Sequence, residues 1–153
     1  MVLKESDERL MQQALAEAKV ALGVGEVPVG ALLVVDNTTF SSYNLKTLQN
    51  DPTAHAEMQV LRKGAYSLGR WRLGGTLYST LEPCMMCAGA LVQARVDRLV
   101  YGAADPRGGG CGSIFDIVRE PRLNHCIEVK GGVLAEESSR LLEFFFKGLR
   151  AEK

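Results

Sequence analysis

The strongest constraint on this chain comes from two short segments whose side chains have to meet in space. The first is His55–Glu57 (HAE) and the second is Pro83–Cys87 (PCMMC). Cys84 follows His55 by 29 residues, so only folding brings the imidazole to the thiols. Thiolate sulfur and imidazole nitrogen are donors that suit Zn²⁺. The sequence therefore predicts a fold in which two distant segments converge on one zinc ion.

The spacing within each segment indicates how the donors are presented. Cys84 and Cys87 lie three residues apart at the start of a helix opened by Pro83, so both sulfurs face the same side. A helix N-terminus favours the thiolate that binds zinc, and His55 starts a helix of its own. Three protein ligands leave the fourth tetrahedral position for water, whose pKa zinc lowers towards about 7. Glu57 can then stand beside that water as a general acid and base.

Two other interpretations of the cysteine pair are weaker. A structural zinc site needs a fourth ligand, and the candidates Cys111, Cys126 and His125 have no paired spacing. A redox pair leaves the His-x-Glu segment unexplained. The pattern favours a catalytic zinc site.

Composition and charge limit the class of protein. The length of 153 residues suits one domain over residues 1–153, and the 46% hydrophobic and 24% charged residues are usual for a globular protein. Lysine plus arginine and aspartate plus glutamate number 18 each, so net charge gives no support for a nucleic-acid partner, although a local patch suffices. Since no apolar run is long enough to cross a membrane, we expect no membrane contact and a cytoplasmic location, or an organellar one if a transit peptide has been removed.

Hydrophobic periodicity predicts strands that alternate with helices. Ser6 or Asp7 caps a first helix that ends at Gly23, and Thr53 caps a helix that begins near Ala54. The other expected helices are Cys84–Ala94 and about Glu136 to Arg150, the latter with a core stripe of Leu134, Leu141, Leu142, Phe145 and Leu149. The expected strands are Val29–Val35, Thr38–Tyr43, Thr76–Leu81, Arg98–Tyr101 and Cys126–Val129. This order indicates a layered α/β domain with a mixed sheet.

The two segments, read together as H-x-E and P-C-x-x-C, resemble the signature of the cytidine/deoxycytidylate deaminase superfamily. Within it the chain is most similar to the bacterial-type tRNA adenosine deaminases. The segments that carry this likeness are EVPVGA (26–31), DPTAHAE (51–57), TLYSTLEPCMMCAG (76–89) and LLEFFF (141–146). The resemblance implies a three-layer cytidine-deaminase-like fold with a central mixed five-stranded sheet flanked by helices. It also implies one zinc ion per chain and a homodimer.

The resemblance further implies the reaction. Adenosine at the wobble position of a tRNA anticodon becomes inosine, through attack of zinc-bound hydroxide on C6 with Glu57 moving the protons. The partner is then the anticodon loop. Asn44 would hydrogen-bond the base and Phe146 would contact the loop. The backbone of Ala56 and apolar walls complete the set of substrate contacts, the walls being Val27, Leu81 and Pro83.

Alternatives stay open at this point. Val27 and Leu81 also fit plain core packing, and Asn44 fits a turn at a strand end. The same zinc centre serves deaminases of a free base or nucleotide of the guanine, cytosine or cytidine type. A non-catalytic RNA-binding subunit is disfavoured, because such a subunit should lack Glu57. Fewer basic residues at the last helix than in close relatives weaken the assignment of the tRNA contact surface.

Overall fold

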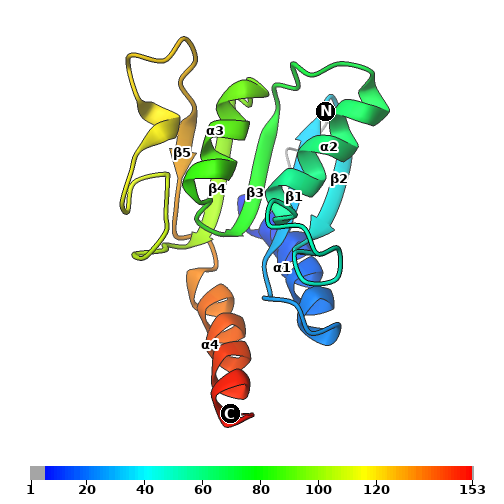
Figure 1. The fold of residues 1–153 in the computed structure, drawn as a ribbon. Helices are drawn as coiled ribbons and strands as arrows, with labels where there is room; N and C mark the ends of the chain where they lie inside the picture. The colour runs from blue at the N-terminus through cyan, green and yellow to red at the C-terminus, as the bar shows by residue number, and fades with distance from the viewer. Residues whose placement is uncertain (1–5, 153) are drawn as a thin grey trace.

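The protein, seen here as a computed structural model that describes residues 6–152, is built on one sheet (Figure 1). The helices are α1 (Asp7–Gly23), α2 (Ala56–Leu68), α3 (Met85–Gln93) and α4 (Ala135–Ala151), with a short 3₁₀ helix at Ile117–Arg119. The strands are β1 (Gly30–Val35), β2 (Thr38–Tyr43), β3 (Thr76–Leu81), β4 (Arg98–Ala103) and β5 (Glu128–Lys130).

The sheet has five strands in the order β2-β1-β3-β4-β5. β1 pairs antiparallel with both β2 and β3, whereas β3, β4 and β5 run parallel. A parallel pair needs a crossover connection, and α3 supplies the one between β3 and β4. The expectation of a mixed five-stranded sheet flanked by helices is confirmed.

Helices cover both faces of the sheet, which makes three layers. Side chains alternate along a strand, so neighbouring residues of β1 enter different cores. Leu33 packs in the cluster that holds α2 and α3, while Leu32 packs against α1, and both are almost fully buried. In Figure 1, α2 and α3 lie side by side over one face and α1 lies behind the sheet. The N-termini of α2 and α3 therefore start from the same side of the same layer.

Several predicted boundaries need correction. α2 begins at Ala56 rather than near Ala54, with His55 as its N-cap residue. The Thr53 hydroxyl is engaged elsewhere, because it donates to Asp51 Oδ1 at 2.7 Å. The cap of α1 is Ser6, whose hydroxyl accepts from the Arg9 amide at 3.2 Å. β1 starts one residue later than expected, β4 continues to Ala103, and β5 lies at Glu128–Lys130 rather than at 126–129.

The predicted core stripe of α4 is wrong at its C-terminal end. Ser138 is the one buried residue among those of α4, where Leu141 and Leu142 are only half-buried. Leu149 is 42% exposed, whereas Phe145 is half-buried like Leu141 and Leu142. Figure 1 shows why: the helix leaves the sheet and extends past its end, so only the first turns have a core to pack against. No helix among residues 6–152 has the length and apolar character to span a membrane.

A half-buried ion-pair cluster ties the start of α1 to the sheet. Arg98 donates to both carboxylate oxygens of Asp7, at 2.8 and 2.7 Å, and the hydroxyl of Tyr78 donates to the same group at 2.9 Å. Lys130 adds a bond of 3.1 Å. The hydrogen bonds from Arg98 are the main reason that the pKa of the Asp7 carboxyl lies well below its usual range. Burial is the main reason that the pKa of Tyr78 is raised to about 12, and the contact with Asp7 raises it further.

The loss of stability caused by removing the Asp7 carboxylate should depend on pH. A carboxyl with a lowered folded-state pKa contributes stability above its unfolded pKa of about 3.9, and loses that contribution as the pH falls towards the folded value. We expect Asp7→Asn to lower the free energy of unfolding by about 2 kcal/mol at neutral pH, and by progressively less below about pH 4. Urea unfolding of the native chain and of Asp7→Asn across this pH range measures the two free energies of unfolding.

The matched control is Asp36→Asn. Asp36 pairs with Arg70 at 2.8 Å, but the two side chains are 72% and 45% exposed. An exposed pair contributes about 0–1 kcal/mol, so this variant should stay close to the native protein at each pH. A difference for Asp7→Asn that does not change with pH would contradict the account.

Candidate active site and metal centre

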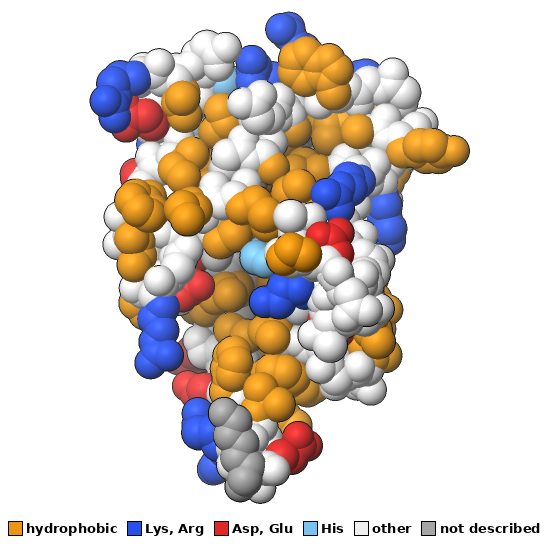
Figure 2. Space-filling view, viewed as in Figure 1, with side chains coloured by type: hydrophobic (Ala, Val, Ile, Leu, Met, Phe, Trp, Pro, Cys, Tyr) orange, Lys and Arg blue, Asp and Glu red, His pale blue; other side chains and the backbone are white. Residues whose placement is uncertain are grey.

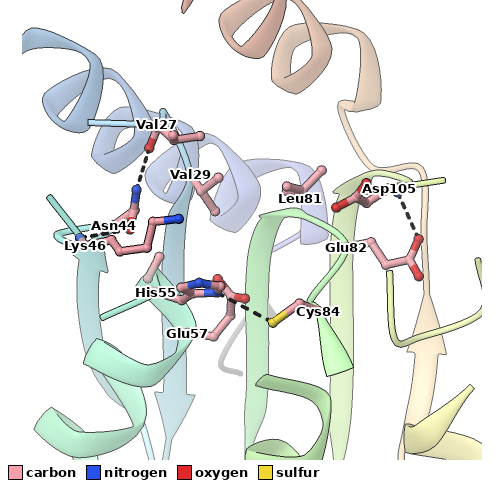
Figure 3. Close-up of a pocket in the computed structure, with 11 residues that line it drawn as sticks. Val27, Val29, Asn44, Lys46, His55, Glu57, Leu81, Glu82, Cys84 and Asp105 are labelled. Atoms are coloured by element: carbon pink, nitrogen blue, oxygen red, sulfur yellow. Dashed lines mark hydrogen bonds between the residues drawn. The ribbon is translucent and has the colours of Figure 1, made fainter. Parts of the chain in front are cut away.

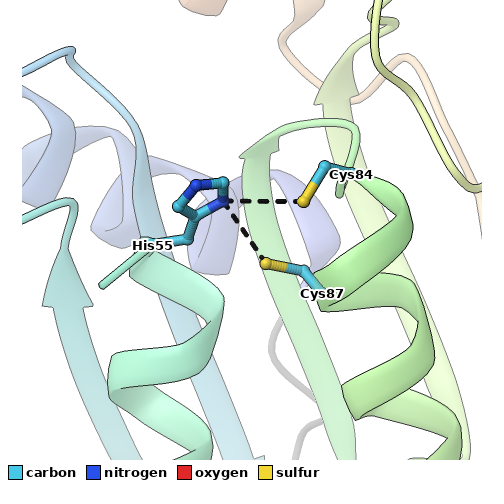
Figure 4. A group of neighbouring side chains, drawn as sticks. All are labelled: His55, Cys84 and Cys87. Carbon is cyan, nitrogen blue, oxygen red and sulfur yellow. Dashed lines mark hydrogen bonds between the residues drawn. The ribbon is translucent and has the colours of Figure 1, made fainter. Parts of the chain in front are cut away.

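His55, Cys84 and Cys87 come together where α2 and α3 begin (Figure 4). His55 is the N-cap residue of α2 and Cys84 is the N-cap residue of α3, so neither side chain is part of a regular turn. His55 Nδ1 lies 3.6 Å from Cys84 Sγ and 3.5 Å from Cys87 Sγ. Neither cap residue makes a side-chain hydrogen bond to its own helix, which leaves both donors free to point at one another.

These three side chains fit a zinc ion. Their ligand atoms all lie within 4.8 Å of one another, and no other group of His, Cys, Asp or Glu in residues 6–152 meets that condition. Zn–S and Zn–N bonds of about 2.3 and 2.05 Å at tetrahedral angles place sulfur and nitrogen roughly 3.5 Å apart, which matches the observed separations. Cys111, Cys126 and His125 stand outside this group, so the structural-zinc interpretation lacks its fourth ligand.

The two cysteines differ in their affinity for the proton. The hydrogen bond with Cys87 is the main reason that the pKa of Cys84 is lowered to about 3, and the contact with His55 lowers it further. The same hydrogen bond with Cys84 raises the pKa of Cys87, which is also fully buried. Contact with the Cys84 thiolate raises the pKa of His55. Cys84 is thus the donor that loses its proton most readily, whereas Cys87 and His55 hold their protons more tightly and release them when a divalent cation binds.

Glu57 lies beside the three donors but outside their group. It stands in the first turn of α2 and is 3% exposed, and its Oε1 is the only buried side-chain oxygen or nitrogen in the described residues without a hydrogen-bond partner. Burial is the main cause that raises the pKa of Glu57. An unpaired buried carboxylate is costly, so its persistence indicates a partner that binds there, such as water or a substrate.

A pocket of about 140 Å³ opens directly above these groups (Figure 3). Of the residues expected to touch substrate, four line it: Val27, Asn44, Ala56 and Leu81. Pro83 and Phe146 are not among its lining residues, so their substrate contacts stay predictions. The structure adds four lining residues that sequence reasoning missed, namely Val29, Lys46, Glu82 and Asp105.

Glu82 fixes the loop that closes the far side of the pocket. Its carboxylate is 1% exposed and accepts from the backbone amides of Asp105, Cys111 and Ser113 at 3.0, 3.1 and 3.1 Å. The hydroxyl of Ser113 donates to it as well. A Cβ on Gly109 would lie 2.1 Å from Glu82 Oε2, so the loop approaches this closely only with glycine there. The sequence could have identified Glu82 as a residue near the site, because it directly precedes the P-C-x-x-C segment.

A second, more open hollow of about 350 Å³ adjoins the first and shares His55 and Cys84 with it. Its wall includes Met85, Ile114 and Phe115, which are 60%, 50% and 53% exposed, together with the side chain of Arg107 on the rim. Figure 2 shows apolar side chains gathered over this face of the molecule. The metal centre therefore opens to a small pocket and to a broad surface at once.

A three-layer sheet domain with two cysteine sulfurs, one imidazole and an adjacent buried carboxyl group defines a zinc-dependent deaminase. Comparison with known proteins supports the same class of enzyme. Residues 4–103 match the family described as the cytidine and deoxycytidylate deaminase zinc-binding region.

Several similar proteins identify one family of these deaminases. The chain is 49% identical to the tRNA-specific adenosine deaminase of Haemophilus influenzae, across 99% of this chain and 90% of that protein. It is 48% identical to the Bacillus subtilis enzyme of the same name, across 96% and 92%. A solved structure from studies of A-to-I editing by tRNA:A34 deaminases at the wobble position is 44% identical, with a TM-score of 0.83 over 88% of this chain and 99% of that one. The chain belongs to the tRNA-specific adenosine deaminase family.

The metal centre generates a direct prediction about zinc and stability. We expect one zinc ion per chain and, because zinc joins two separate helices, a melting temperature that falls by roughly 5–10 °C on chelation. Cys87→Ala should lose the zinc and show the lower melting temperature without chelator. Metal analysis and thermal unfolding measure both.

Cys126→Ala is the matched control, because this exposed thiol lies outside the donor group. Its zinc content and chelator response should equal those of the native chain. Full zinc occupancy in Cys87→Ala would remove Cys87 from the metal site.

Proposed function

We propose that this protein deaminates adenosine to inosine at the wobble position of a tRNA anticodon. The observation that carries the proposal is the pocket that brings His55, Glu57 and Asn44 together beside the cysteine pair. Its substrate class follows from the relatives, which are tRNA-specific adenosine deaminases at up to 49% identity over nearly the full chain.

The residues have separable roles in this reaction, which replaces the C6 amino group of adenine by oxygen and releases ammonia. His55, Cys84 and Cys87 would hold the zinc ion, which when bound supplies the Lewis acidity that makes water nucleophilic near neutral pH. Glu57 takes the proton of the attacking water, delivers it to N1 of the base and then assists the departure of ammonia. A raised pKa suits a carboxyl that both accepts and returns a proton.

The pocket walls orient the base. Asn44 lies at the rim of the pocket opposite Leu81, and the apolar side chain of Val27 borders it (Figure 3). We propose that Asn44 hydrogen-bonds the base between these walls, while the backbone of Ala56 lies beside the reacting carbon. The volume suits one flipped base rather than a whole loop, so the neighbouring nucleotides belong in the adjoining hollow.

Two surfaces support a polynucleotide rather than a free base as substrate. The open hollow places Phe115 and Arg107 beside the metal centre, an aromatic ring and a cation of the kind that bind unstacked bases and phosphates. On α4, Phe146 is 43% exposed and precedes Lys147. We propose that Phe146 contacts the anticodon loop. A cytoplasmic location, where such a substrate occurs, remains a prediction.

A deamination assay tests the function. We expect inosine to form in an anticodon stem-loop with adenosine at the wobble position, and free adenosine, cytidine and guanine to react at least about 100-fold more slowly, because they lack the binding energy of the flanking nucleotides. Turnover of free guanine or cytidine with an inert stem-loop would instead establish the small-molecule alternative. That alternative merits the comparison, since guanine deaminase of Bacillus subtilis is 29% identical with a TM-score of 0.64.

Glu57→Gln is the matched control for this assay. It keeps the side-chain volume and removes the proton shuttle, so activity should fall about 10³-fold or more while zinc content and folding persist. Its stability should equal or exceed that of the native chain, because Glu57 Oε1 has no partner to lose. Retained activity would exclude Glu57 from the role assigned to it.

We also propose a homodimer formed through α3. The segment MMCAGALVQ is apolar apart from its cysteine and final glutamine, and such a helix is normally covered on all sides. Its inner side buries Cys87 and Leu91, whereas Met85 is 60% exposed and Gly89 is half-buried on the other side. An exposed apolar patch of this kind marks an interface.

The oligomeric state tests that proposal. Because a Cβ on Gly89 has no atom within 4 Å, Gly89→Arg should leave the fold of one chain intact while placing a bulky cation in the interface. We expect analytical ultracentrifugation to give a dimer for the native chain and a monomer for this variant. Gly23→Arg, equally unobstructed but on α1, is the control that should stay dimeric. A native chain that sediments as a monomer would contradict the proposal.

A further inference from the structure

Glu26 is a buried carboxylate that the chemistry above does not use. It lies between α1 and β1 and is 1% exposed. Its Oε1 accepts from the Leu48 amide at 2.6 Å, and its Oε2 accepts from the Thr47 amide at 3.2 Å and from Asn44 Nδ2 at 3.3 Å. None of the ion pairs in residues 6–152 includes it. A buried charge persists only when hydrogen bonds compensate it, so these three donors and the carboxylate hold one another in place.

Three contacts, one of them with Glu26, decide which way the Asn44 amide points. An amide can turn either its oxygen or its NH₂ group to a neighbour, but a carboxylate and a carbonyl oxygen accept only. Asn44 Nδ2 faces two such acceptors, Glu26 Oε2 and the Val27 carbonyl, at 3.3 Å each. Its Oδ1 accepts from the Lys46 amide at 3.1 Å. Every neighbour therefore selects the same orientation, and the charged one is Glu26.

Asn44 lines the pocket that holds His55 and Glu57, whereas Glu26 lies behind it and outside the lining. Both bonds of 3.3 Å are at the long end of the hydrogen-bond range, so an N–H of Asn44 can turn to an incoming acceptor at little cost. The ring nitrogens of adenine are acceptors. An Asn44 that presents N–H is suited to such a nitrogen, and a flipped amide would present oxygen instead.

We propose that Glu26 is a positioning residue for the deamination, acting through Asn44. Its carboxylate accepts from the NH₂ group of Asn44, which fixes the end of the amide that acts as donor, and it anchors the backbone at 47–48, which follows Asn44 in the chain. A neutral glutamine at position 26 can offer either a donor or an acceptor, so it removes the charged acceptor and leaves only the Val27 carbonyl and the Lys46 amide to select the orientation of Asn44. This inference rests on the proposed contact between Asn44 and the base.

A double-mutant cycle in the stem-loop deamination assay tests the inference. The variants are Glu26→Gln, Asn44→Ala and the two combined, each checked for zinc content and melting temperature. We expect each single variant to lower kcat/KM about 30-fold and the double variant to be no worse than Asn44→Ala by more than about threefold, because the second change removes the group through which the first acts.

The control cycle replaces Glu26→Gln by Asp51→Asn. Asp51 also accepts hydrogen bonds within this loop, from the Thr53 amide at 2.9 Å and the Thr53 hydroxyl at 2.7 Å, and no hydrogen bond within residues 6–152 joins its side chain to Asn44. Any effect of Asp51→Asn should multiply with that of Asn44→Ala. A purely structural contribution of Glu26 would behave in the same way, so multiplying losses in the Glu26 cycle would overturn the inference. Native activity of Glu26→Gln beside an impaired Asn44→Ala would overturn it too.

Glu26→Asp is the second variant if the glutamine substitution prevents folding. Aspartate keeps the buried charge, but its side chain is shorter by one methylene, so its carboxylate should not reach Asn44 and Leu48 together. The same double-mutant cycle with Asn44→Ala then applies. The failure of this inference is separable from that of the proposed function. An inert native chain on the stem-loop removes the function, whereas an active native chain with multiplying losses removes only the role of Glu26.

Discussion

The convergence of His55 with Cys84 and Cys87 is the interaction on which the rest of the structure depends. Each donor stands at or just after the N-cap of a helix, and both helices lie on one face of the sheet, so their first residues meet at one end of the same layer. Neither helix could shift along the sheet by one turn, about 5.4 Å, and keep the donors within reach of a single ion. The order of the strands, with β1 and β3 adjacent, sets the distance between the two helices.

Around this centre, buried carboxylates form a second level of organisation. Glu57 is buried with an oxygen left unpaired and faces the chemistry, whereas Glu26 and Glu82 are buried with backbone amides around them. Glu26 fixes the loop after β2 and Glu82 fixes the loop after β4, and these loops lie on opposite sides of the pocket. Three acidic residues of similar burial thus have different tasks, and the difference lies in whether each carboxylate has its hydrogen-bond donors.

The sequence predicted helices and strands well where residue spacing alone determines them. It predicted them less well where tertiary contacts determine the ends of an element or the burial of a residue. The ends of β2 and β3 and the zinc donor set followed from alternation and spacing. The start of α2 did not, because the Thr53 side chain binds Asp51 instead of capping the helix. The exposure of Leu149 was missed because amphipathic spacing cannot show that the sheet ends before the helix does. Lys46 and Asp105 were missed for a similar reason: they line the pocket only through the path of their loops.

X-ray absorption spectroscopy at the zinc edge of the purified native chain can identify the zinc ligands, because it reports the atoms around the ion without reference to activity. We expect two sulfur neighbours together with lighter nitrogen or oxygen neighbours. Four sulfur neighbours, or a spectrum without sulfur, would contradict the assignment of His55, Cys84 and Cys87 as the zinc ligands.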